Sequence, residues 1–330
     1  MLTQSEQPLR AAVIGVGHLG RFHAQKFKRI AGVELVTVVD TDAARARQVG
    51  EELQIPWTDD FRPLLDHRVD LVSIAVPTRH HFAVAKACLS AGIHVLLEKP
   101  MTVTQRESAK LVQLAQRRDC LLQVGHIKRF HPCVEAVRQG DYLRRPRYIQ
   151  SHRMAPFKDR SLDVDVVLDL MVHDIDLALL FAGAEVVSIE AFGRSMLDHS
   201  RNDIATARLF FANGCVADLN VSRVAHEAQR TLSLFQKQGS ITIDFIAKTI
   251  ELATKTPATA QGSISDVTRR LMPVNDQDAL EQQIRSFCHA VRHHLPVEVD
   301  GRVGHKVLTL ALAVLESIQA GKRMARKMRR

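Results

Sequence analysis

The segment Gly15-Val16-Gly17-His18-Leu19-Gly20 constrains the fold of this chain more than any other feature. It follows an apolar run at 9–14 and precedes residues with helical spacing, so it predicts a strand, a tight turn and a helix. In such a turn the first glycine permits the reversal, the second lets the backbone approach a pyrophosphate, and the third lets the helix pack on the strand. The helix N-terminus supplies unpaired N–H groups for phosphates. The motif therefore predicts a dinucleotide site.

A second predicted strand, 33–39, ends at Asp40, which lies 20 residues after Gly20. A carboxylate at this place accepts hydrogen bonds from the adenosine ribose hydroxyls and repels a 2′-phosphate. The sequence therefore favours NAD as the cofactor over NADP.

Predicted strands and helices alternate in the first part of the chain, which is typical of a Rossmann fold with a doubly wound parallel sheet at 1–126. The strands are expected near 9–14, 33–39, 70–76, 94–98 and 121–125, and the helices near 18–30, 42–53, 80–91 and 105–118.

The pattern changes after residue 126, where longer alternating runs predict a C-terminal α+β domain with a largely antiparallel open sheet. This second domain, 127–330, is expected to bind substrate and to form oligomer contacts, and its last helix could pack back on the first domain. Its strands are expected near 146–153, 184–195, 204–211, 215–223, 229–236, 240–245 and 249–253, and its closing helices near 276–293 and 301–320.

Composition narrows the class of protein. The 330 residues suggest two domains, and the net charge of +9 fits either an arginine-rich surface or an anionic substrate. Five scattered cysteines without a CxxC pair indicate reduced thiols in the cytoplasm and predict no metal site. No transmembrane segment, secretion signal or nucleic-acid motif is predicted, and the basic end 321–330 is expected to be a solvated helix terminus, or less readily a contact for an acidic membrane face.

Two further patterns suggest catalysis. Glu98-Lys99-Pro100 follows a buried strand, which places a lysine at the strand end where a bound dinucleotide would terminate. A helix is expected over Leu162–Phe181, on which Asp165, Asp169 and His173 share a stripe with Asp176 nearby. A histidine one turn from a carboxylate suits a general base, although a structural His–Asp pair or a metal site are the alternatives.

These motifs, with Ala75-Val76-Pro77-Thr78, His81 and Gly125-His126, resemble the Gfo/Idh/MocA oxidoreductase family over essentially the whole chain. The resemblance implies that Lys99 and His173 flank the carbon being oxidised, with Asp169 orienting His173. It also implies cofactor contacts from Val76, Pro77, His81, Glu98 and Lys99, beside the glycine motif and Asp40. Family members usually carry glycines just before the Asp–His helix. This chain has Asp163-Val164-Asp165-Val166-Val167 there, so substrate contacts from that turn are not carried over.

The stretches DVDVVLDLMVHDIDLAL, ANGCVADLNVSRV and VGHIKRF are similar to the subgroup that oxidises the 3-hydroxyl of UDP-N-acetylglucosamine for lipid A synthesis. The resemblance implies a nucleotide-sugar substrate, bound by Lys99, Asp169 and His173. Arg129, Arg153, Lys158 and Arg160 would suit its diphosphate, with surface solubility as the equal alternative. Whether Lys99 or His173 accepts the proton stays open.

Other functions fit the same residues. An inositol or simple sugar dehydrogenase, an NAD-dependent glycosidase and a non-catalytic NAD or sugar sensor are the alternatives. Leu219, Val221, Leu232 and Leu234 are expected on an exposed face of the second sheet, which would favour a homodimer or homotetramer.

Overall fold

The computed structural model describes residues 7–66, 69–142, 145–157, 164–197, 201–255 and 267–327. The chain forms two compact units, which are described separately. The first comprises Met1–Ile127 with Asp278–Leu308, and the second comprises Lys128–Gln277 with Thr309–Arg330.

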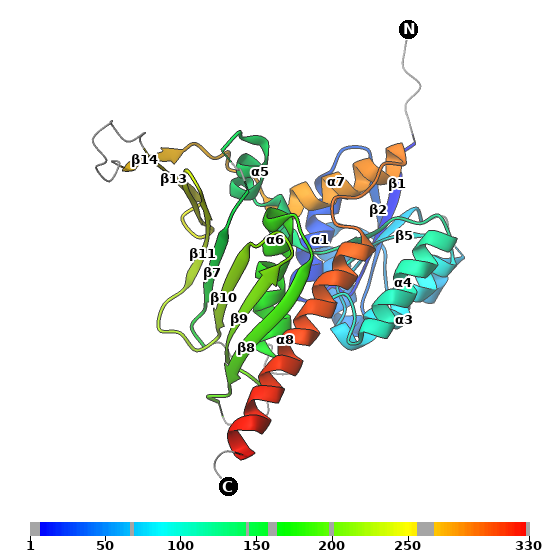
Figure 1. Cartoon of the computed structure of the whole chain (residues 1–330). Coiled ribbons are helices and arrows are strands. Elements are labelled where there is room, and N and C mark those ends of the chain that lie inside the picture. The colour runs from blue at the N-terminus through cyan, green and yellow to red at the C-terminus, as the bar shows by residue number, and fades with distance from the viewer. Residues whose placement is uncertain are drawn as a thin grey trace, which may run out of the picture. The chain divides into compact units, whose positions relative to one another are not determined.

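The first unit is built on a parallel six-stranded sheet with strand order β3-β2-β1-β4-β5-β6. Its strands β1, β2 and β5 are labelled in Figure 1. This order reverses between β1 and β4, the place where doubly wound sheets bind ligands. The strands are β1 (Leu9–Ile14), β2 (Val33–Val39), β3 (Trp57–Thr58), β4 (Leu71–Ile74), β5 (His94–Leu97) and β6 (Leu122–Val124). The helices are α1 (His18–Arg29), α2 (Ala43–Leu53), α3 (Thr78–Ser90), α4 (Gln105–Arg117) and α7 (Ala279–His293), with a 3₁₀ turn at Arg62–Leu65.

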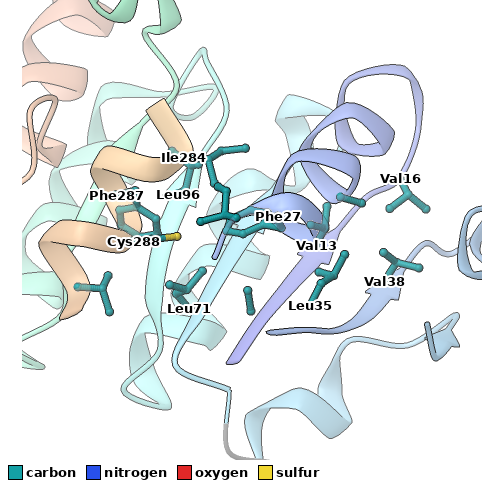
Figure 2. Packing of buried hydrophobic residues seen from close by; sticks show 14 of the residues in the cluster. Val13, Val16, Phe27, Leu35, Val38, Leu71, Leu96, Ile284, Phe287 and Cys288 are labelled. Atoms are coloured by element: carbon teal, nitrogen blue, oxygen red, sulfur yellow. The ribbon is translucent and has the colours of Figure 1, made fainter. Parts of the chain in front are cut away.

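Apolar residues from β1, β2 and α1 form one core with α7, which comes from the far end of the chain. Phe27 of α1 and Phe287 of α7 are both fully buried and belong to the same cluster (Figure 2). Ile284 and Cys288 of α7 also lie in this cluster. The first unit therefore depends on residues from the last part of the chain for part of its core.

The second unit contains an eight-stranded sheet with order β14-β13-β12-β11-β7-β10-β9-β8. All neighbours are antiparallel except β7 and β10, which run parallel. The strands are β7 (Tyr148–Met154), β8 (Val186–Arg194), β9 (Ile204–Phe211), β10 (Val216–Ser222), β11 (Gln229–Gln236), β12 (Gly239–Asp244), β13 (Thr249–Lys255) and β14 (Val267–Met272). A 3₁₀ turn at Ile127–Phe130 leads into α5 (Pro132–Gln139), and α6 (Val172–Ala182) packs on β7 and β10. The predicted fold class, a parallel Rossmann sheet followed by a largely antiparallel one, is confirmed.

The expected exposure of four leucine and valine side chains is wrong. Leu219, Val221, Leu232 and Leu234 are all completely buried within the chain. Strand alternation identifies the apolar face of a strand but does not say whether the chain's own helices cover it. Among the side chains whose burial the structure describes, the large apolar ones exposed on this sheet are instead Val187, Phe192, Ile204, Phe235 and Leu271.

The helix expected over 162–181 begins later and differently. Its first described turn, Val167–Met171, is a π-helix, and regular α-helix starts at Val172. Asp165 lies before this turn, and its carboxylate accepts hydrogen bonds from the Val167 and Asn202 backbone N–H groups and the Asn202 side chain. Asp165 therefore anchors the helix N-terminus and does not share a helical stripe with Asp169 and His173.

The last helix, α8 (Gly301–Lys327), passes from the first unit into the second. By length and composition, Gly301–Arg323 could cross a membrane, which the count of apolar residues did not predict. However, Val307, Leu308, Ala311, Val314 and Ile318 form a buried stripe along it, which is the pattern of a helix packed in a protein core. The length and composition of this helix are therefore only weak evidence for a membrane span.

Candidate active site

The three glycines of the motif differ in the space around them. A Cβ on Gly20 would lie 1.7 Å from the Gly15 carbonyl oxygen, and one on Gly15 would lie 2.8 Å from the Ala75 and Val76 backbone. Gly15 also has a φ of +86°, which glycine adopts readily. A Cβ on Gly17 would meet no atom within 4 Å. The outer glycines therefore serve the turn itself, whereas the open space at Gly17 fits a pyrophosphate resting on the N-terminus of α1.

Asp40 follows β2 and is only 8% exposed. Its carboxylate accepts hydrogen bonds from the Val16 and Asp42 N–H groups, at 2.9 and 3.0 Å. Arg45 of α2, which is half-exposed, donates to both carboxylate oxygens at 3.1 and 3.3 Å. The predicted ribose-binding carboxylate is thus fixed beside the glycine turn, with an arginine next to it.

Glu98, which precedes Lys99, is held by a buried chain of polar groups. His23 of α1 is 1% exposed and lies between Ser73, at 2.7 Å, and the Glu98 carboxylate, at 3.2 Å. Burial alone would raise the pKa of Glu98, but the hydrogen bond and charge of His23 and the charge of Lys99 lower it. A Cβ on Gly125 would lie 2.7 Å from a Glu98 oxygen, so glycine leaves room for this carboxylate. Glu98 is therefore an ionised positioning residue for Lys99, whose backbone N–H donates to it.

His81 joins two of the loops that carry predicted cofactor contacts. Its Nδ1 lies 3.0 Å from the Pro100 carbonyl oxygen and its Nε2 lies 2.8 Å from the Val76 carbonyl oxygen. Burial lowers the pKa of His81, against these carbonyls and Glu98, which raise it. Its ring is 1% exposed, so it ties the Glu98–Pro100 loop to the Val76–Pro77 loop. The contact of His81 with the cofactor stays a prediction.

The candidate catalytic pair lies on the π-turn and the first turn of α6. Asp169 and His173 are four residues apart and both are partly exposed. The acidic residues that come after them, Asp174 and Asp176, are buried. Asp169 and His173 belong to the second unit, while Lys99 belongs to the first unit. Their convergence on one substrate stays a prediction.

Two of the arginines predicted to bind a diphosphate are committed to those buried aspartates. Arg129 forms a bidentate pair with Asp176, at 2.6 and 3.0 Å. Arg153 forms another with Asp174, both contacts being 2.8 Å. Both arginines are buried, at 7% and 4% exposed, so these pairs hold the 3₁₀ turn and β7 against α6. Lys158 and Arg160 lie outside the described residues.

Sequence reasoning did not single out His23, Ser73 and Arg45. His23 sits on the apolar face of α1, where the pattern indicates a core histidine. Glu98 is far from it along the chain, so no local signal points to the pair. Arg45, in contrast, lies five residues after Asp40 at the start of the next helix, so its approach was open to inference. Among the described residues, no group of three or more His, Cys, Asp or Glu side chains could hold a metal ion.

Comparison with known proteins agrees with this geometry. Residues 9–126 match the model of an oxidoreductase family with an NAD-binding Rossmann fold, and residues 136–242 match the Gfo/Idh/MocA C-terminal domain. UDP-N-acetylglucosamine 3-dehydrogenase of Acidithiobacillus ferrooxidans is 42% identical over 312 residues, covering 94% of this chain and 98% of the relative. Its solved structure has a TM-score of 0.89, with 96% of this chain and 99% of that chain covered.

A more distant relative acts on another alcohol. Myo-inositol 2-dehydrogenase of Thermotoga maritima is 26% identical over 327 residues, covering 94% of this chain and 96% of the relative. The family models and the full-length relatives show an NAD-dependent oxidoreductase that acts on CH–OH groups. The glycine turn fits the dinucleotide. The chain belongs to the Gfo/Idh/MocA family of oxidoreductases.

Proposed function

We propose that this enzyme oxidises the 3-hydroxyl of UDP-N-acetylglucosamine to a ketone. The observation that carries this proposal is the 42% identity with the Acidithiobacillus ferrooxidans 3-dehydrogenase over almost the full length of both chains. Inositol dehydrogenases in the same family are less similar or match a smaller part of the chain. The nucleotide sugar is therefore the favoured substrate.

The residues of the first unit would hold NAD, which supplies the hydride acceptor when bound. The turn Gly15–Gly20 offers backbone N–H groups and open space at Gly17 for the pyrophosphate. Asp40, to which Arg45 donates, would accept hydrogen bonds from the adenosine ribose hydroxyls. His81 and Glu98 fix the loop that carries Lys99.

The proton and the developing charge on the substrate oxygen would be handled by Lys99 and His173. A lysine ammonium next to that oxygen stabilises negative charge as the C–H bond breaks. His173, oriented by Asp169, would accept the hydroxyl proton. The reverse assignment, with Lys99 as the proton acceptor, uses the same groups.

The substrate is tested with a panel of nucleotide sugars and free polyols, with NADH formation followed by absorbance. We expect turnover of UDP-N-acetylglucosamine and little turnover of myo-inositol or free N-acetylglucosamine. Oxidation of a polyol alone would support the inositol dehydrogenase alternative. Conversion of a sugar without net NADH would support an NAD-dependent glycosidase, and NAD binding without any turnover would support a sensor.

The role of Lys99 is tested by Lys99→Ala. Loss of a positioned acid–base or electrostatic group is expected to lower kcat by about 10²- to 10⁴-fold. NAD affinity should change little, since the Gly15–Gly20 turn stays intact. Lys110→Ala, on the exposed surface of α4, removes the same charge and should keep wild-type turnover. A Lys99→Ala enzyme with nearly normal kcat would contradict the assignment.

The same proposal extends to the pathway, the cellular compartment and the oligomeric state of the enzyme. Its 3-keto product is suited to amination, so we place the enzyme in the synthesis of a lipid A precursor. All five cysteines are free and buried, which suits the reducing cytoplasm. The exposed apolar side chains Val187, Phe192 and Leu271 of the second sheet support a homodimer or homotetramer.

A further inference from the structure

The 3₁₀ turn Ile127–Phe130 carries two adjacent cations with different surroundings. Arg129 forms a bidentate ion pair with Asp176. Lys128 is half-buried, and no carboxylate among the described residues lies within ion-pair distance of its Nζ. A lysine that loses much of its water without gaining a carboxylate is costly, so its position calls for a further explanation.

An aromatic side chain lies below the Lys128 ammonium. Nζ is 5.2 Å from the centre of the Phe245 ring, which is within the range of a cation–π contact. Phe245 is 6% exposed, and the His131 ring packs edge-on against it with ring centres 5.0 Å apart. The ammonium is thus held in place from one side, without a counterion there.

Several charged groups lie around Lys128. Arg153 of β7 is neutralised by Asp174 of α6. The charge of Arg230 of β11 acts on Lys128. Asp244 and Lys248 lie near Cys133, and Lys248 forms an ion pair with Asp276. Of the titratable groups on α5 and its cap, burial and the charge of Lys128 lower the pKa of His131 to about 4, and burial raises the pKa of the Cys133 thiol to about 11. Both are therefore neutral near pH 7.

These surroundings shift the pKa of Lys128. Burial, with the charges of Arg153 and Arg230, lowers the pKa of Lys128 to about 8, and Asp174 only partly opposes the shift. At neutral pH the ammonium is still charged, but it is weakly compensated. An anion beside it would relieve both costs.

We propose that Lys128, held over Phe245, binds the diphosphate of the nucleotide-sugar substrate. The inference rests on the proposed function for the identity of the anion. The charge of Asp174 acts on Lys128, and Asp174 follows His173 on α6. The anion would therefore lie in the part of the second unit that carries His173, the candidate base. This role replaces the one predicted for Arg129 and Arg153, whose guanidiniums are already paired.

The test is the affinity for UDP, measured by calorimetry with NAD at saturation so that the dinucleotide site is filled. Lys128→Met should weaken UDP binding by about 10- to 100-fold, the range for loss of a hydrogen bond to a charged group. Lys128→Arg keeps the charge and should recover most of the affinity. Lys110→Met is the matched control and should bind UDP like the wild type. Equal UDP affinity in the wild type and Lys128→Met would overturn the proposal.

A second measurement covers the case in which Lys128→Met does not fold. UDP affinity of the wild type should fall as the pH rises through about 8, where Lys128 loses its proton, and Lys128→Arg should not show this fall. A wild-type affinity that is flat from about pH 7 to about pH 9, across the titration of this lysine, would contradict the inference.

The two proposals fail separately. If the wild type does not oxidise UDP-N-acetylglucosamine but binds UDP or inorganic pyrophosphate through Lys128, the anion site stands and the substrate assignment falls. If the wild type turns over UDP-N-acetylglucosamine and Lys128→Met changes neither its KM nor the UDP affinity, the substrate assignment stands and the role of Lys128 falls.

Discussion

At the scale of single residues, the glycines of the turn meet two different requirements: Gly20 is needed for folding and Gly17 for NAD binding. Gly17→Ala places a methyl group in open space at a φ of −63°, which any residue adopts. The variant should keep its stability within about 1 kcal/mol and lose NAD affinity by about 10-fold or more, because the methyl group lies where the pyrophosphate would rest. Gly20→Ala drives a methyl group into the Gly15 carbonyl and should cost about 2 kcal/mol or more. Thermal melts and NAD titrations of both variants distinguish the two effects; a folded, NAD-binding Gly17→Ala would be contrary to the assigned site.

Asp40 and Arg45 set the choice between the two nicotinamide cofactors. Asp40→Ala removes the carboxylate that would repel a 2′-phosphate and leaves Arg45 without that partner. The ratio of kcat/KM for NAD to that for NADP should fall by about 10-fold or more, since an arginine at this place suits a 2′-phosphate. The double variant Asp40→Ala with Arg45→Ala should lose NAD preference without gaining NADP activity. An unchanged cofactor ratio in Asp40→Ala would count against the ribose-binding role.

At the scale of elements, α5 has a titratable cap. His131 precedes the helix, and its Nδ1 accepts a hydrogen bond from the Cys133 N–H. Burial and the charges of Lys128 and Lys248 lower the pKa of His131 to about 4, from an ordinary value of 6.5. Because folding lowers the pKa of this histidine, the unfolded chain binds a proton more readily than the folded one. The contribution of His131 to the free energy of unfolding is therefore complete above about pH 6.5 and is lost as the pH falls toward about 4.

We expect the melting temperature of the wild type to fall between about pH 6.5 and about pH 4, and that of His131→Asn to fall less over the same range. Asparagine accepts the same cap hydrogen bond but does not titrate. The contribution of His131 should be on the order of 3 kcal/mol at full effect. Parallel melting curves of the two proteins across this pH range would exclude His131 as the acid-sensitive group.

Elements also show where prediction from sequence succeeds and where it stops. The turn at Gly15–Gly20 was predictable because it is a local pattern. The start of α6 was not, because Asp165 bonds to Asn202, which is 37 residues away, and a π-turn replaces the expected α-turn. The faces of β10 and β11 were misassigned, since the alternation in Leu219 and Val221 is the same whether the chain or a partner covers them. β3 was missed because Trp57–Thr58 is too short to alternate.

For the candidate site, residue types were predictable and partners were not. Lys99, Asp169 and His173 stand in recognisable patterns. The hydrogen-bonded chain Ser73–His23–Glu98 joins three segments that are far apart in the sequence, so no residue spacing predicts it. Arg129 and Arg153 carry the charge that suits a phosphate, but only the structure shows that Asp176 and Asp174 already hold them.

At the scale of the whole molecule, the first compact unit is not a contiguous piece of chain. Phe287 and Ile284 of α7 complete the core around Phe27. A fragment ending at residue 127 would expose this core, so we expect it to show no cooperative thermal unfolding. In the full chain Phe287→Ala should lower the free energy of unfolding by about 3–5 kcal/mol. Circular dichroism melts check both, and a cooperative, NAD-binding fragment would show that α7 is dispensable.

The π-turn at Val167–Met171 has a consequence for how this enzyme could diverge. A π-turn accommodates one more residue than an α-turn, so removing one residue there can restore a regular helix without disturbing the rest of α6. The anchors of α6, Asp174 and Asp176, would keep their guanidinium partners, while the side chains before the deletion would swing by about a quarter of a revolution. A single codon loss is therefore a short evolutionary route by which the groups preceding His173 could be re-aimed, and a new substrate accepted, on an unchanged scaffold.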